Sequence, residues 1–287
     1  MLSKFLSFPF VIILLVCLYY TWEGEITSLY IIPNVIILAS IFVLSPQIDW
    51  LWYQKNPPEM DEKMRIFLEK LFPYYRNLSP KEKKRFEVRV TLYIIATEFM
   101  PKAMEYVPED LKGLIAANVV MLTFGQKDYR LSDFEKIITY PHPFPSPQFP
   151  KHFHSSEIFA EDGVILFSLE YLVPGATRQR QFYNIALHEY VKIFQLSYPD
   201  YQYPKIDNAL SEKLELISGF KNEKVLEFIG LPILEPSVLA INYFFTFPQQ
   251  FKNELPDIYD EYSKIFNQNP LNYQFPVIEN EKRGHRI

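Results

Sequence analysis

The sequence predicts an α+β protein, in which a mostly helical domain with a small sheet follows an N-terminal hairpin of two transmembrane helices. Two long uncharged apolar runs open the chain, and beyond residue 57 apolar residues recur mainly at helical spacing. The chain has 287 residues, 48% of them hydrophobic and 22% charged, which is enough for one sizeable core. We therefore expect the hairpin and a juxtamembrane segment in residues 1–57 and one globular domain in residues 58–287.

The first predicted element is the hairpin, with spans of about residues 5–22 and 26–44 joined by the short segment TWEGE. A bilayer core of about 30 Å requires about 20 apolar residues in a helix. The alternative is a signal peptide followed by a buried segment. Bulky Leu18, Tyr19 and Tyr20 offer no small-residue cleavage site, and a second apolar run follows at once, so the hairpin is favoured.

The few charges around the hairpin predict its orientation. Lys4 and Lys55 flank the outer ends, whereas the connecting loop holds Glu23 and Glu25 and no basic residue. The positive-inside rule then places both chain ends, and with them the soluble domain, in the cytoplasm of a two-pass inner-membrane protein. The lone Cys17 agrees with a reducing compartment and excludes an intramolecular disulfide and a cysteine-based zinc site.

In the soluble part, the pattern predicts helices before strands. Ser79 is a plausible N-cap, with Pro80 at the first helical position. Helices are expected over residues 57–78, 79–99 and 107–125, and strands over residues 134–141 and 162–173. A formal net charge of −5 argues against a nucleic-acid partner, because phosphate contacts require a basic face.

The segment NIALHEYVK, residues 184–192, begins like the H-E-x-x-H helix of a zinc peptidase. In that motif, two histidines four residues apart bind zinc and the intervening glutamate polarises a bound water. Here His188 and Glu189 form the first pair, but Lys192 holds the place of the second histidine. An adjacent His-Glu pair by itself proves nothing, so the surrounding segments decide its meaning.

Several segments between about residues 66 and 270 resemble the bacterial Mlc titration factor A (MtfA) family of zincin-type peptidases. In order, they are LSPKEKKRF, LIAANVVMLTFG, IITYPHPF, GVILFSLEYL, NIALHEYVK and LPDIYDEYSKIFNQNP. Each is weak alone, and their order and spacing make the resemblance specific. It implies a zincin-like fold and, since family members bind a transcriptional repressor, a protein-binding role.

Carried over by position, the resemblance implies that two of three zinc ligands are replaced. His188 matches the first ligand and Glu189 the catalytic base, now both vestigial, and Lys192 replaces the second histidine. Asn242, before an aromatic run, replaces the glutamate that is the third ligand. An ammonium repels Zn²⁺ and offers no lone pair, so no zinc or other cofactor is expected, and we expect the ammonium to be held by Glu189 and Asn242.

An alternative metal site is conceivable at His152 and His154, which share a face if the chain is extended there, although alternate histidines in a proline-rich loop are more often plain polar residues. The favoured function is a pseudopeptidase that binds a cytoplasmic protein or peptide along a cleft strand containing Val164, Leu166 and Ser168. A peptidase with unconventional ligands and a purely structural membrane scaffold remain as alternatives.

Overall fold

The computed structural model describes residues 2–24 and 28–272, and the chain divides into two compact units, Met1–Pro58 and Glu59–Ile287. Residues 25–27, which hold the end of the predicted hairpin loop and the start of the second predicted span, lie outside the described residues. So do residues 273–287 at the C-terminus.

The first unit is helical. Its elements are α1 (Leu2–Trp22), the short 3₁₀ helix η1 (Ser28–Tyr30), α2 (Ile31–Val43) and α3 (Ser45–Lys55). Of the helices in the described part of the chain, only α1 is by itself long and apolar enough to cross a membrane. Helix α2 has 13 residues, or about 20 Å at the usual rise, and α3 continues it only after a bend of 58°. One apolar N-terminal helix is therefore confirmed, whereas a second span requires the bent pair to act as one and stays a prediction.

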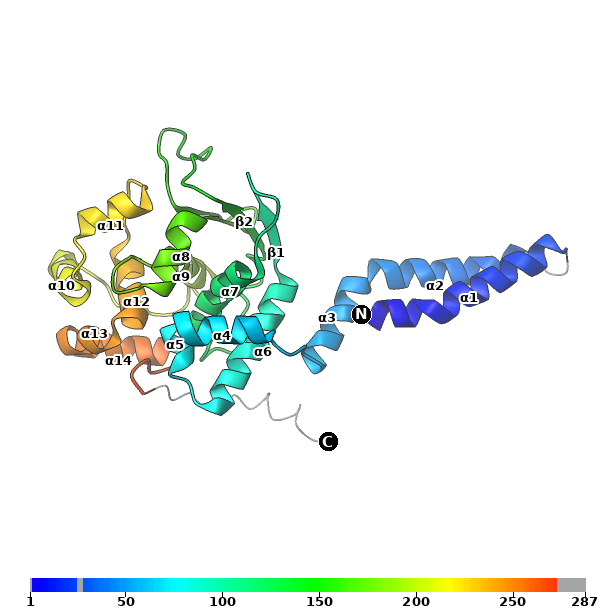
Figure 1. Cartoon of the computed structure of the whole chain (residues 1–287), viewed down its shortest axis with the longest axis horizontal. Helices are drawn as coiled ribbons and strands as arrows, with labels where there is room; N and C mark the ends of the chain where they lie inside the picture. The colour runs from blue at the N-terminus through cyan, green and yellow to red at the C-terminus, as the bar shows by residue number, and fades with distance from the viewer. Residues whose placement is uncertain (1, 25–27, 273–287) are drawn as a thin grey trace. The chain divides into compact units, whose positions relative to one another are not determined.

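Helices α1 and α2 pack side by side, and α3 returns to the start of α1 (Figure 1). The backbone nitrogen and the hydroxyl of Ser3 each donate a hydrogen bond to the Asp49 carboxylate, both at 2.8 Å. Large apolar side chains of this unit are exposed, among them Phe5 at 80% and Phe42 at 80%. Apolar surface on this scale needs a covering medium or partner.

The second unit combines helices with one four-stranded sheet. Its helices are α4 (Glu62–Leu71), α5 (Pro73–Arg76), α6 (Pro80–Ala96), α7 (Glu109–Thr123), α8 (Leu169–Thr177), α9 (Ile185–Ser197), α10 (Asn208–Ser218), α11 (Asn222–Ile229), α12 (Pro236–Thr246), α13 (Pro248–Glu254) and α14 (Pro256–Ile265). Its strands are β1 (Glu98–Pro101), β2 (Lys136–Tyr140), β3 (Ser156–Phe159) and β4 (Val164–Ser168). The architecture is thus mostly helical α+β, as predicted.

The strands lie in the order β1-β2-β4-β3. Strands β1, β2 and β4 are parallel, and β3 runs antiparallel to β4 at one edge. The predicted strand over residues 162–173 is half wrong, because β4 ends at Ser168 and α8 begins at Leu169. The neighbouring β2 ends opposite Ser168 and is followed by Pro141, whose carbonyl accepts a hydrogen bond from Glu170, so no further ladder is available there.

The predicted helix over residues 79–99 also ends early. Ser79 accepts a hydrogen bond from the backbone of Glu82, which confirms it as the N-cap of α6. The helix stops at Ala96, and Glu98 enters β1. The predicted helix over residues 107–125 is confirmed as α7, and residues 57–78 form α4 and α5 with a break at Phe72.

The core lies around helix α9. This helix packs against α7, α8, α12 and β3, and α7 is buried along almost its whole length (Figure 1). A helix that is apolar on all sides belongs in the centre of a domain. Residues 185–191 of α9 are all buried, so the polar groups among them are held in place by neighbouring elements.

Candidate active site

Helix α9 is fixed at its start by Asn184. The Asn184 side chain accepts a hydrogen bond from the backbone nitrogen of Leu187 at 3.1 Å, which caps the helix. Its amide nitrogen donates to Asn118 Oδ1 on α7 at 2.8 Å. The cap therefore sets the position of the His188–Glu189 turn relative to α7.

Glu189 lies at the centre of a buried polar cluster. Its Oε2 accepts a hydrogen bond from Lys192 Nζ at 2.9 Å, and its Oε1 accepts one from the Ser156 hydroxyl on β3 at 2.8 Å. The Glu189 side chain is fully buried, and that of Lys192 is 20% exposed. Burial alone would raise the pKa of Glu189, but the Lys192 charge and the two hydrogen bonds outweigh it, so that the pKa lies below its usual value. Glu189 is thus a carboxylate with both oxygens engaged.

His188 is held by a different partner. Its Nδ1 lies 2.8 Å from the hydroxyl of Tyr183, which stands just before the helix cap. Burial lowers the pKa of His188 to about 4, so that the ring is neutral at pH 7. Burial raises the pKa of Tyr183 well above its ordinary value, so its hydroxyl stays protonated.

Asn242 lies on α12, which packs against α9, but it does not take the predicted role. Its amide nitrogen donates to the backbone oxygen of Asn184 at 2.9 Å, and the side chain is buried. The ammonium of Lys192 is thus held by Glu189, as expected, and the Asn242 part of that expectation is corrected. The amide instead ties α12 to the start of α9, at a carbonyl that also accepts the helical hydrogen bond from the backbone nitrogen of His188.

These residues do not fit the zinc ion that the family resemblance implies. A catalytic zinc site needs three protein ligands and an open position. Of the positions that the resemblance implies, the second holds the Lys192 cation and the third holds the Asn242 carboxamide, which is bonded to a backbone carbonyl, while the Glu189 carboxylate is paired with the same cation. No zinc-dependent step can be derived from this arrangement.

The other histidines do not rescue a metal site. The two ring nitrogens of buried His154 face the Glu157 carboxylate and the backbone oxygen of His152, each at 3.0 Å. His142 lies 2.9 Å from Glu170 at the surface. Among the residues that the structure describes, no three His, Cys, Asp or Glu side chains gather closely enough to hold a metal ion.

The predicted cleft strand is also corrected. Val164, Leu166 and Ser168 lie in β4, which is hydrogen-bonded to β2 on one side and to β3 on the other. A strand with both sides paired cannot accept an extended peptide. The strand at that edge of the sheet is β3, which carries Ser156 of the Glu189 cluster.

Sequence reasoning missed Ser156 and Tyr183. Ser156 lies 33 residues before Glu189 in the chain, and no spacing rule connects them. Tyr183 is five residues before His188, outside the span of one helical turn, and only the loop that precedes α9 brings the two together.

Comparison with known proteins supports the resemblance. No curated protein matches the chain significantly. The family model described as glucose-regulated metallo-peptidase M90 matches residues 50–194, just over half of the chain. The matched range includes His188, Glu189 and Lys192 and ends before Asn242. The chain belongs to the M90 family of glucose-regulated metallopeptidases, the MtfA family.

Proposed function

We propose that this protein is a membrane-anchored pseudopeptidase of the M90 family, which binds a protein or peptide partner without hydrolysing it. One observation carries the proposal: Lys192 Nζ lies 2.9 Å from Glu189 Oε2. In an active H-E-x-x-H site that carboxylate must accept a proton from a metal-bound water. Here its charge is balanced by an ammonium, and its other oxygen is held by Ser156.

Membrane anchoring is supported by the exposed apolar surface of the first unit. Helix α1 is long enough to span a bilayer, and little of its apolar stretch is buried within the protein. The Ser3–Asp49 hydrogen bonds join the start of α1 to α3, which favours a chain that returns to the side from which it entered. The proposed anchor is therefore the hairpin, with the second unit in the cytoplasm.

Partner binding is favoured over a purely structural role by an open pocket beside the altered site. It encloses about 360 Å³ and is lined in part by Tyr183, the hydrogen-bond partner of His188. Of the two edge strands, β1 and β3, we assign an extended peptide to β3, because it carries Ser156 of the Glu189 cluster. Both features belong to the second unit.

The test is the metal content and activity of the full chain purified in detergent. We expect no stoichiometric zinc by elemental analysis and no chelator-sensitive cleavage of unstructured protein substrates. One tightly bound zinc per chain that is lost in His188→Ala would instead establish a peptidase with unconventional ligands. As a control for an effect of the chelator on folding, the melting temperature of the same protein should be equal with and without chelator.

A further inference from the structure

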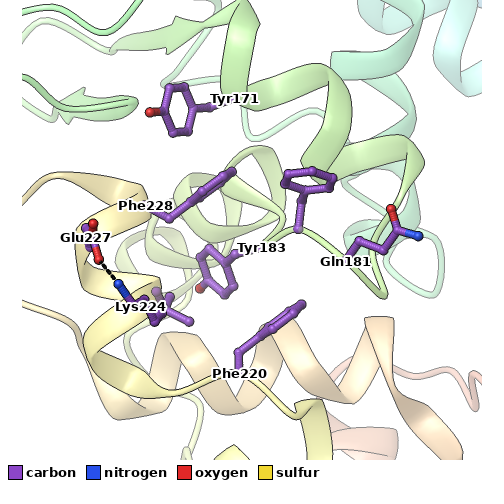
Figure 2. Close-up of a pocket in the computed structure, with 9 residues that line it drawn as sticks. Tyr171, Gln181, Tyr183, Phe220, Lys224, Glu227 and Phe228 are labelled. Carbon is purple, nitrogen blue, oxygen red and sulfur yellow. Dashed lines mark hydrogen bonds and ion pairs between the residues drawn. The ribbon is translucent and has the colours of Figure 1, made fainter.

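The pocket beside Tyr183 is built from aromatic rings (Figure 2). Its apolar lining comes from α8, from the loop before α9, from α11 and from the loop just before α11. The residues are Tyr171, Phe182, Tyr183, Phe220, Val225 and Phe228. At about 360 Å³ it lies at the small end of the range for ligand sites, about 300–1,000 Å³, so it suits one ring system better than an extended molecule.

The rings are arranged to receive another ring. Tyr171 and Phe228 meet edge to face with centroids 4.6 Å apart, and Phe182 lies 6.2 Å from Phe228. Aromatic pairs prefer such edge-to-face or offset contacts, because the ring face is negative and the edge positive. Faces and edges that line one hollow therefore favour an aromatic occupant over an aliphatic one.

The charged and amide side chains of the pocket are exposed to solvent and offer little to a free polar ligand. Lys224 and Glu227 pair with each other at 2.6 Å, both largely exposed, so the two charges cancel at the rim. Gln181 is exposed, and the one buried polar group, the Tyr183 hydroxyl, is bonded to His188. An occupant therefore gains its affinity mainly from contacts with the apolar lining, and its polar parts are best placed outside the hollow. A side chain that projects from a peptide backbone meets this condition.

The pocket is also joined to the edge strand where a peptide would lie. Helix α11 forms one wall, and the carbonyl of Ile229 at its end accepts a hydrogen bond from the backbone of Ser155 at 2.8 Å, directly before β3. Gly230 ends α11 with a φ of +82°, and a Cβ there would lie 2.3 Å from the carbonyl oxygen of Phe153. Because only glycine fits this approach, the wall is held firmly against the start of β3.

We propose that this pocket receives one aromatic side chain of the peptide partner and so sets which partners bind. The inference rests on the proposed function, since it specifies the partner of the same site. A leucine or lysine at that position of the partner should bind less well, because neither offers a ring face and edge to Tyr171 and Phe228.

The test is a selection of random peptides displayed on phage against the full chain in detergent. We expect enriched peptides to share one aromatic position, and its replacement by alanine in a synthetic peptide to weaken Kd roughly tenfold to a hundredfold. Tyr171→Ala and Phe228→Ala should weaken the parent peptide similarly and leave little further loss when the peptide ring is removed. Tyr106→Ala, which removes a ring that is 67% exposed and outside the pocket, is the matched control and should bind as the parent does.

The outcomes separate the two proposals. If the enriched peptides lack an aromatic position, or if neither correctly melting pocket variant affects binding, the pocket assignment is wrong and partner binding stands. If no peptide is enriched, partner binding is wrong and the pocket assignment fails with it. Mass spectrometry of the bound peptide gives a third readout, because chelator-sensitive cleavage would refute the pseudopeptidase while ring-dependent binding would still support the pocket.

Discussion

The ammonium of Lys192 lies 2.9 Å from the carboxylate of Glu189, one helical turn away along α9, and the carboxylate is fully buried. The lysine therefore does more than fail to bind a metal. It supplies the positive charge that a buried carboxylate needs, so that the helix stays stable with an ionised Glu189 at its centre.

Removing only the lysine charge should cost much stability. In Lys192→Met the Glu189 carboxylate keeps its Ser156 hydrogen bond but loses its counter-charge, and breaking a buried pair in this way costs about 3 kcal/mol. Glu189→Gln in the same chain should recover much of the loss, because it removes the charge that was left alone. Denaturant unfolding of the parent, both single variants and the double variant measures this coupling.

The matched control for that cycle is Lys224→Met. Lys224 also pairs with a glutamate three residues along a helix, but its side chain is 75% exposed and that of Glu227 is 70% exposed. An exposed pair of this kind contributes little, so we expect no measurable change in stability. If Lys192→Met changes the free energy of unfolding as little as Lys224→Met does, Glu189 does not depend on its buried counter-charge.

The low pKa of His188 predicts a loss of stability in mild acid. The folded state holds the ring neutral down to about pH 4, whereas the unfolded chain takes up the proton near pH 6.5. The unfolded state thus binds more protons between these values, and stability falls as the pH drops through that window, by roughly 3 kcal/mol over its full width. His188→Asn, which keeps a polar partner for Tyr183, should flatten the decrease between pH 6.5 and 5.

Two observations isolate this effect. The pKa of Glu189 is also lowered, but the stability that this group contributes is complete above about pH 4.5 and is lost only below it. His142→Gln is the control, because that ring is 79% exposed, and its unfolding profile should follow that of the parent. If the stability of His188→Asn depends on pH as that of the parent does, the assignment of a neutral, buried His188 ring is wrong.

Sequence patterns predicted the elements that a local signal defines. Ser79 and Pro80 mark the start of α6, and the apolar run through residues 107–125 gives α7. The segment order that resembles the MtfA family led to the correct family before any contact was known. In these cases the information lies within one stretch of chain.

Contacts between distant segments could not be predicted in this way. Strands β1 and β3 have four residues each, too few for a pattern of alternation to stand out. That β4 is an interior strand depends on β3, which pairs with it only in the folded chain. Asn242 was assigned to Lys192 by position, but its amide donates instead to the Asn184 carbonyl at the start of α9, a contact between distant segments that no local pattern reveals.

The proposed topology makes both chain ends cytoplasmic. Ser3 and Asp49 are hydrogen-bonded, so the start of α1 and helix α3 belong on the same side of the membrane. Reporter fusions after Asn56 and at the C-terminus should both signal the cytoplasm, and a fusion after Gly24 should signal the opposite side. A single span would be indicated if the fusions after Gly24 and Asn56 reported the same side.

Restoring the two replaced ligand types should rebuild a zinc site only when both are changed. Lys192→His removes the cation, and Asn242→Glu adds a third ligand to His188. Asn242→Glu alone should destabilise the fold. The Asn242 amide donates a hydrogen bond to the Asn184 carbonyl, whereas a buried carboxylate has no proton to donate and would face that carbonyl oxygen unpaired. The double variant should recover stability when zinc is added, since metal binding to the folded state adds to the free energy of unfolding. Thermal melts of the parent, both single variants and the double variant, each with zinc and with chelator, measure this directly. A zinc-dependent rise in the double variant alone would support the assignment of both positions, and a correctly folded double variant whose melting is indifferent to zinc would show that Asn242 or Lys192 does not occupy a former ligand position.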